Sequence, residues 1–149
     1  MAPPAQVFRA PSAVERIFNR VFGFLVDLGG GFSYNYLLQV RGRNSGKLYS
    51  NPINLLEVAG KRYLVAPRGR TQWVRNAESA NEITLKKGSS RSKFRLRPLQ
   101  GQEKLEVLKT YLDTFKREVK IYFPVPDGSP VEAFVGIADN YPAFELLPT

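Results

Sequence analysis

Residues 34–66, YNYLLQVRGRNSGKLYSNPINLLEVAGKRYLVA, carry the alternation of apolar runs and turn residues that decides the fold. The apolar run from Tyr36 to Val40 predicts a first strand. Gly, Asn and Ser are concentrated in residues 41–46, so a turn is expected there. Lys47 to Val58 predicts a returning strand that is interrupted near Pro52, because proline cannot donate a ladder hydrogen bond.

The rest of the chain predicts more strands, with two helices between them. Residues 59–61 turn the chain into a strand over residues 62–66, which completes a meander. Strands are also predicted at 83–87 and 92–96, which form a hairpin across 88–90, and residues 132–138 and 143–147 are expected to supply a last strand or two. Helices are predicted at 71–80, around Trp73, and at 103–117, with Leu105, Leu108, Leu112 and Phe115 on one face. This order suits a small barrel with helices packed outside it.

The N-terminal part carries its own helical pattern. Residues 1–11 are rich in proline and are expected to be flexible, and Ser12 with Glu15 forms a capping-box pattern. The apolar spacing that follows predicts an amphipathic helix over residues 12–28. We expect this helix to pack on the barrel, with peripheral contact to a membrane as the alternative. The 149 residues are then expected to form a single domain.

The sequence contains no cysteine and no histidine, which excludes several kinds of chemistry. Disulfides, cysteine nucleophiles, Ser-His-Asp triads and zinc sites with Cys or His ligands are ruled out, and no metal site is expected. An enzyme of this composition would position its substrate while a cofactor reacts. The N-terminus lacks a signal-peptide pattern, and the longest apolar stretch, Val21 to Val26, is too short to span a bilayer, so a cytoplasmic location is expected.

The net charge of +9 is concentrated in the middle of the chain. Residues 39–97 contain fourteen Lys and Arg against three Glu, a net charge of +11, whereas the remaining residues sum to −2. A basic middle between nearly neutral flanks indicates an anionic partner. Phosphate-bearing cofactors, nucleic acids and acidic membrane surfaces all have the required charge.

The first candidate binding segment is the basic turn from Arg41 to Lys47. Its glycines allow positive φ and bring backbone N–H groups close to a ligand. Ser45, Arg43 and Lys47 would complete a cradle for a phosphate. The alternative is a basic hairpin turn without a ligand. The segment is no Walker A loop, because no Gly-Lys-Ser/Thr opens a helix after it.

The second candidate segment runs from Ala66 to Asn76. A strand ends at Ala66, a glycine-bearing loop follows, and a helix begins near Thr71. The free N–H groups at that helix start, beside Arg68 and Arg70, suit an anion or an electron-rich ring oxygen. Trp73 is the only tryptophan of the chain, and we expect it to pack in the core rather than to stack on a ligand.

Two further sets of residues fit ordinary structural roles better than binding. Four cations alternate along one predicted strand and share its solvent face: Arg91, Lys93, Arg95 and Arg97. The alternative is that these cations form a surface that binds a nucleic acid or the tail of a cofactor. Seven aromatic residues follow late in the chain and are expected mostly in the core, although tyrosine can line a pocket: Tyr111, Phe115, Tyr122, Phe123, Phe134, Tyr141 and Phe144.

Taken in order, the two loops resemble the deazaflavin-dependent nitroreductase family, a branch of the flavin/deazaflavin oxidoreductases. The segments that carry the resemblance are Gly42-Arg43-Asn44-Ser45-Gly46-Lys47, Asn51-Pro52, and Val65-Ala66-Pro67-Arg68-Gly69 leading to Trp73 and Asn76. They match the family's order of Gly-Arg-x-Ser/Thr-Gly, Asn-Pro, and a glycine-bearing loop before Trp-x-x-Asn. The resemblance implies a mainly β (α+β) fold, a split β-barrel of about six to seven antiparallel strands with two or three flanking helices.

The resemblance also implies a coenzyme, the 8-hydroxy-5-deazaflavin F420, and the residues that bind it. By position, the phosphate and side-chain tail are expected at Arg43, Asn44, Ser45, Gly46 and Lys47, and the site also includes Asn51 and Pro52. The ring is expected along Ala66, Pro67, Arg68 and Gly69, with Trp73 and Asn76 bracing that loop. Tyr49 stands where some relatives have an arginine. No catalytic residue is assigned.

The implied activity is hydride transfer from the reduced coenzyme to a small hydrophobic acceptor such as an enone, a quinone or a nitro compound. One alternative is a related split barrel that binds FMN or haem. Others are a small nucleic-acid-binding barrel and a carrier of a hydrophobic ligand without turnover. Nucleic acid is disfavoured because the aromatic residues lie outside the basic middle, whereas stacking platforms interleave aromatics with cations. A homodimer is left as an open alternative, because no segment of the sequence indicates an interface.

Overall fold

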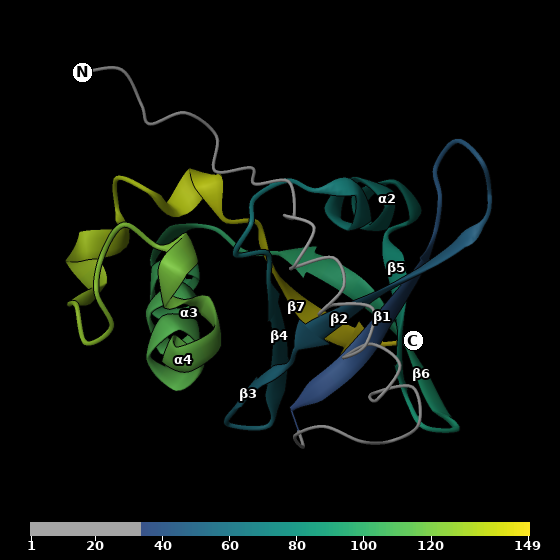
Figure 1. Ribbon diagram of the computed structural model, residues 1–149, viewed down its shortest axis with the longest axis horizontal. Coiled ribbons are helices and arrows are strands. Elements are labelled where there is room, and N and C mark those ends of the chain that lie inside the picture. The colour runs from purple at the N-terminus through teal and green to yellow at the C-terminus, as the bar shows by residue number, and fades with distance from the viewer. Residues whose placement is uncertain (1–33) are drawn as a thin grey trace.

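Seven antiparallel strands form one sheet in the computed structural model, which describes residues 34–149 (Figure 1). The predicted N-terminal helix at residues 12–28 and the proline-rich residues 1–11 lie outside the described part. The strands are β1 (Asn35–Arg41), β2 (Leu48–Asn54), β3 (Leu56–Val58), β4 (Lys61–Val65), β5 (Glu82–Lys87), β6 (Ser90–Pro98) and β7 (Ala143–Pro148). The helices are α2 (Gln72–Ala80), α3 (Gly101–Thr114) and α4 (Lys116–Val119), with 3-10 helices η1 (Lys120–Tyr122), η2 (Val131–Phe134) and η3 (Ala138–Asn140).

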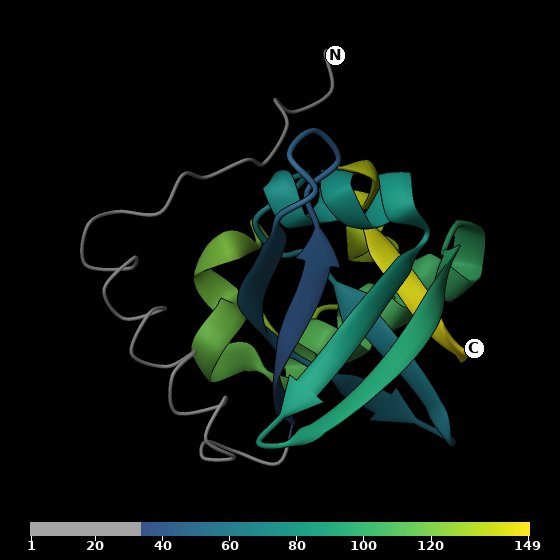
Figure 2. The ribbon, with the colours of Figure 1, turned by 90° about the vertical axis from the view of Figure 1, so that its right-hand side faces the viewer.

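The sheet curls because its two end strands are consecutive in the chain. The strand order is β2-β1-β5-β6-β7-β4-β3, and a single residue, Leu55, separates β2 from β3. The two ends of the sheet must therefore approach one another, and Figure 2 shows β1, β5 and β6 curling across β3 and β4. The predicted meander is wrong at this point: β1–β2 and β3–β4 are separate hairpins that lie at opposite ends of the order.

The predicted interruption of the strand over residues 47–58 is found, but at Leu55 and not at Pro52, which lies inside β2 and pairs with Leu37. An end strand pairs on one side only, so it tolerates a residue without an N–H group. The chain instead breaks at Leu55, which is buried and whose amide donates to the Tyr34 carbonyl at 2.8 Å. This break lets the chain leave one end of the sheet and enter the other.

The hairpin of β5 and β6 and helix α2 form where the sequence predicts them. The predicted helix at 103–117 is divided in two at Phe115, whose ring is buried. Of the last strand or two expected over 132–138 and 143–147, only the second segment is a strand, β7, because η2 and the start of η3 occupy the first. Its backbone groups form short-range bonds, Ala133 N–H to the Pro130 carbonyl at 3.0 Å and Ile137 N–H to the Phe134 carbonyl at 3.2 Å, in place of a ladder.

Two apolar clusters hold these elements together. The first lies between α3, the short helices and β3–β4, and it contains most of the late aromatic residues, as predicted: Tyr111, Phe115, Phe123, Phe134 and Tyr141. The second fills the curled sheet beneath α2 and includes Leu38, Leu64, Val74 and Phe144. Figure 1 shows α3 and α4 beside β3 and β4, and α2 at the end of the sheet formed by β1 and β5.

The outward face of β6 is basic, as its alternation predicts. Arg91, Lys93 and Arg95 are exposed, and Phe94 and Leu96 are buried on the other face. Arg97 differs from the first three, because it pairs with two carboxylates described below. Across residues 34–149, none of the helices has the length and apolar character needed to cross a membrane.

Candidate functional site

The two loops singled out in the sequence face the same cavity, which has a volume of about 780 Å³. This volume is typical of sites for small molecules and cofactors. Most of the predicted site residues line it: Arg43, Asn44, Ser45, Asn51, Pro52, Ala66, Pro67, Arg68, Gly69, Trp73 and Asn76. Gly46 and Lys47 do not belong to the lining, so the cavity wall follows the first half of the first loop rather than its end.

The first loop is a tight turn between β1 and β2 that leaves little room for a side chain at position 42. Gly42 N–H donates to the Lys47 carbonyl at 2.7 Å, and Gly46 N–H donates to the Gly42 carbonyl at 2.9 Å. A Cβ atom at Gly42 would lie 2.7 Å from both the Ser45 hydroxyl and the Tyr49 ring. The Lys47 amide donates to the Ser45 hydroxyl at 3.2 Å, which orients that hydroxyl within the turn.

Helix α2 holds the first loop through a buried asparagine. The Asn76 side-chain oxygen accepts from the Arg43 amide at 3.1 Å and from Arg43 Nη1 at 2.8 Å. The same Nη1 donates to Gln72 at 3.0 Å. Asn76 therefore braces the first loop, not the second loop as the resemblance implied. Both side-chain bonds use Nη1, so Nε and Nη2 of Arg43 can still donate to an anion.

The second loop turns sharply between β4 and α2. Gly69, with φ of 85°, donates to the Ala66 carbonyl at 3.2 Å, and the Thr71 amide donates to the Gly69 carbonyl at 2.9 Å. The turn brings Ala66, Pro67 and Arg68 to the cavity wall. These are the residues that the resemblance placed along the coenzyme ring.

Thr71 is a lining residue that the sequence analysis did not select. It is the N-cap of α2, yet its side chain makes no capping hydrogen bond. Its hydroxyl oxygen is buried and finds no hydrogen-bond partner among residues 34–149. An unsatisfied buried hydroxyl is costly, so a ligand oxygen or amide in the cavity would stabilise it. The sequence marked Thr71 only as a helix start.

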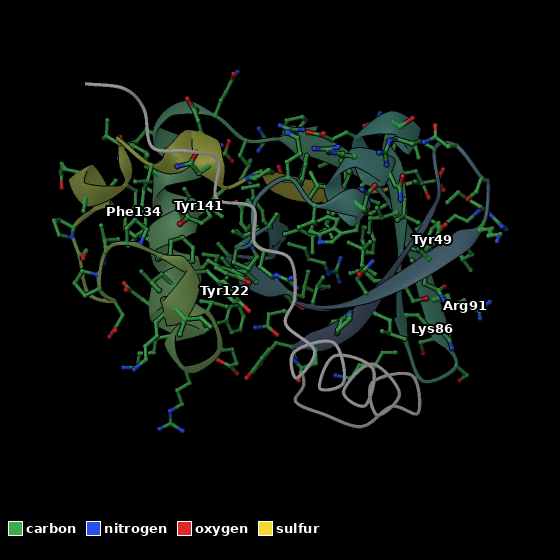
Figure 3. All side chains as sticks on the ribbon, turned by 45° about the horizontal axis from the view of Figure 1, so that its top comes forward. Tyr49, Lys86, Arg91, Tyr122, Phe134 and Tyr141 are labelled. Atoms are coloured by element: carbon green, nitrogen blue, oxygen red, sulfur yellow. The ribbon has the colours of Figure 1, made fainter. Side chains whose placement is uncertain are left out.

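The helical side supplies an aromatic wall with one acid. Tyr111, Val119 and Tyr122 line the cavity together with Glu118. Figure 3 shows Tyr122, the last residue of η1, among the helices on the left and Tyr49, on β2, on the right. The Tyr141 hydroxyl donates to the Tyr122 carbonyl at 2.5 Å, which fixes the backbone that carries the Tyr122 ring.

Glu118 is held by Tyr34. The Tyr34 hydroxyl donates to the Glu118 carboxylate, and the Tyr34 ring packs at 4.7 Å from that of Phe115. Burial, followed by this contact with Glu118, raises the pKa of Tyr34 to about 12. Burial also raises the pKa of Tyr111. Both phenols therefore stay protonated at neutral pH, and that of Tyr34 donates to Glu118. No sequence pattern indicated Glu118, because Tyr34 lies 84 positions away.

The family of the chain follows from these loops together with a match over most of its length. The family model of the F420H2-dependent quinone reductases matches residues 16–118. The chain belongs to this family. It is an F420-dependent reductase with F420 as its coenzyme, and the resemblance to the flavin/deazaflavin oxidoreductases is confirmed. A comparison with curated protein sequences found no match.

Solved structures share the fold of this F420-dependent reductase. An F420-H2 dependent reductase, FDR-A, matches with a TM-score of 0.52 and 19% identity over 76% of this chain and 94% of its own. A structure described as a domain-swapped dimer matches with a TM-score of 0.56 and 18% identity over 89% of this chain and 96% of its own. The haem storage protein HutZ of Vibrio cholerae matches with a TM-score of 0.53 and 9% identity over 78% of this chain and 82% of its own. The predicted mainly β split barrel is confirmed.

The cavity of this reductase suits an anionic, oxygen-rich coenzyme. Arg43 and Arg68 bring two guanidinium groups to its wall, which fits a phosphate and carboxylates. The Thr71 hydroxyl at the start of α2 has the chemistry to bond a ring or phosphate oxygen. The residues present therefore fit F420.

Proposed function

We propose that this reductase transfers a hydride from reduced F420 to a quinone that binds in the same cavity. The observation that carries this proposal is the division of the cavity wall: Arg43 and Arg68 come from the two loops, and Tyr111 and Tyr122 come from the helical side. The cations suit the coenzyme tail, and the aromatic wall suits a flat, apolar acceptor. Enones and nitro compounds have similar shape and remain the other acceptor classes to test.

We assign the coenzyme tail to the first loop. Arg43 is held in place by Asn76 and Gln72, so its remaining donors are pre-oriented toward an anion. Ser45 and Asn44 lie beside it in the cavity wall. The backbone of Ala66 to Gly69 and the Thr71 hydroxyl are then placed to bond oxygens of the ring or the phosphate. Asn51 and Pro52 complete the wall from β2.

The bound coenzyme supplies the hydride, and the quinone takes that hydride with one proton to become a hydroquinone. The protein contributes orientation and a partly dry cavity. Tyr111 and Tyr122 present aromatic surface to the acceptor, and the Tyr141 bond keeps Tyr122 in position. The accompanying proton comes from solvent or from the Tyr122 phenol, which lines the cavity.

This function is tested by following oxidation of reduced F420 through the return of its visible absorbance. The purified protein is mixed with reduced coenzyme and one acceptor at a time: a naphthoquinone, a cyclic enone or a nitroaromatic compound. We expect the naphthoquinone to be reduced with the highest kcat/KM. Oxidation of the coenzyme by none of the three, or a clear preference for the nitro compound, contradicts the proposed acceptor.

A further inference from the structure

The cavity is electrically asymmetric. Arg43 and Arg68 lie on the wall formed by the two loops, and Glu118 lies on the helical wall. Among the lining residues that the structure describes, Glu118 is the one acid. Figure 1 shows α4, which carries Glu118, on the opposite side of the molecule from α2. The two signs of charge therefore come from different elements.

Glu118 is fixed in this position by its neighbours. Tyr34 donates its hydroxyl to the Glu118 side chain, and this hydrogen bond holds Glu118 in its orientation at the cavity wall. Tyr34 in turn packs on Phe115, whose buried ring also contacts Tyr111 at 5.2 Å. A negative charge is thus oriented beside the tyrosines proposed to contact the acceptor.

We propose that Glu118 makes this half of the cavity select uncharged acceptors over anionic ones. The inference rests on the proposed function, and it names the class of acceptor that the site admits. Once the phosphate and carboxylates of the coenzyme neutralise Arg43 and Arg68, the field in the remaining space is that of Glu118. A sulfonate or carboxylate on the acceptor is repelled there, whereas a neutral quinone is unaffected.

The test compares two acceptors that differ in one charge: a neutral naphthoquinone and the same ring bearing a sulfonate. We expect the wild-type protein to prefer the neutral quinone. Glu118→Gln keeps a hydrogen-bond acceptor for Tyr34 and removes the charge. It is expected to raise kcat/KM for the sulfonate about fivefold, with that for the neutral quinone changed less than about twofold. Glu132→Gln, an exposed carboxylate outside the cavity lining, is the matched control and should change neither value.

A second readout needs no turnover. Equilibrium dialysis of each quinone against the protein loaded with oxidised F420 measures acceptor binding without relying on Trp73, which the coenzyme is itself expected to quench. Glu118→Gln should lower the apparent Kd of the sulfonate by the same factor, with that of the neutral quinone changed less than about twofold.

The proposal is overturned if the sulfonate and the neutral quinone differ by the same factor in wild type and in Glu118→Gln, both in kcat/KM and in apparent Kd. It is also overturned if both acceptors lose affinity together, since that result means a structural role for Glu118. Failure of the proposed function gives a different result: the wild-type protein then fails to reduce quinones with F420. Equilibrium dialysis without coenzyme still measures the effect of Glu118 in that case.

Discussion

Arg43 links the sequence motif to the geometry of the site. The motif alone indicated a cation in a turn, and the structure shows how that cation is held. Asn76 accepts from both its amide and its guanidinium, and Gln72 accepts a further bond from Nη1. A long flexible side chain is thereby ordered before any ligand arrives, which lowers the entropic cost of binding an anion.

Arg43→Ala is expected to weaken F420 binding by about 1.5–3 kcal/mol, the usual range for a charge-assisted hydrogen bond. Asn76 still accepts the backbone N–H at position 43, so the loop should stay attached to α2. Titration of the coenzyme's fluorescence measures the change. Arg91→Ala, which removes an exposed cation on β6, is the control and should leave affinity unchanged. Equal affinity in wild type and Arg43→Ala removes Arg43 from the site.

Thr71 provides a second test at the same scale. Thr71→Val keeps the shape of the side chain and removes the hydroxyl, which has no partner among the described residues. We expect F420 affinity to fall by about 0.5–1.5 kcal/mol, with no loss of thermal stability, because no capping bond is lost. Thr71→Ser should retain most of the affinity. A fall in stability without a change in affinity would assign Thr71 to the fold alone.

At the scale of the elements, local patterns could be predicted from the sequence and distant pairings could not. Hairpin β5–β6 and helix α2 rest on turn residues and periodicity within a few positions, and both were predicted. The separation of β2 from β3 depends on how five other strands fit between them, which no local pattern encodes. Likewise, the Arg43–Asn76 bond spans 33 positions, so the motif indicated both residues but not their contact.

The first loop can be tested as an element through Gly42. A Cβ atom there would lie 2.7 Å from the Ser45 hydroxyl and the Tyr49 ring, so Gly42→Ala must displace one of them. We expect a loss of about 1–3 kcal/mol in the free energy of unfolding, together with weaker F420 binding. Gly136→Ala is the matched control, since no atom lies within 4 Å of the added carbon. Unfolding in urea measures the stability of the two variants, and titration of the coenzyme's fluorescence measures their F420 affinity. Equal losses in the two variants would contradict the close approach at Gly42.

At the scale of the whole molecule, Arg97 joins the sheet to the helical layer. From β6 it donates to Glu145 of β7 at 2.7 Å and to Glu103 of α3 at 2.7 Å. Two consecutive elements, β6 and α3, thus meet the distant β7 at one guanidinium. Helix α3 also carries Tyr111, and α4 after it carries Glu118, so this junction attaches the sheet to the helix that leads into the helical side of the cavity wall.

The junction should make stability depend on pH. The hydrogen bond from Arg97 lowers the pKa of Glu103, so folding favours the charged carboxylate. A lowered folded-state pKa stabilises the protein above the unfolded-state pKa, and that contribution is lost as the pH falls through the folded-state value. Glu103→Gln should therefore lower Tm by about 1–4 °C at neutral pH. The difference from wild type should vanish in acid.

Thermal unfolding across this pH range checks the junction. Glu106→Gln, an exposed carboxylate on the same helix, should unfold like wild type at every pH. A destabilisation by Glu103→Gln that persists unchanged in acid would mean that packing, not charge, explains the effect.

Binding of F420 in the cavity between the two loops can be followed by the quenching of Trp73. Trp73 is the only tryptophan and lines that cavity, so its fluorescence reports a ligand at this place. We predict that F420 quenches Trp73 with saturation at one equivalent, and that FMN and a short single-stranded DNA do so weakly or not at all. Binding of F420 that leaves Trp73 unquenched, or tighter binding of FMN or DNA, would mean that this cavity is not the coenzyme site.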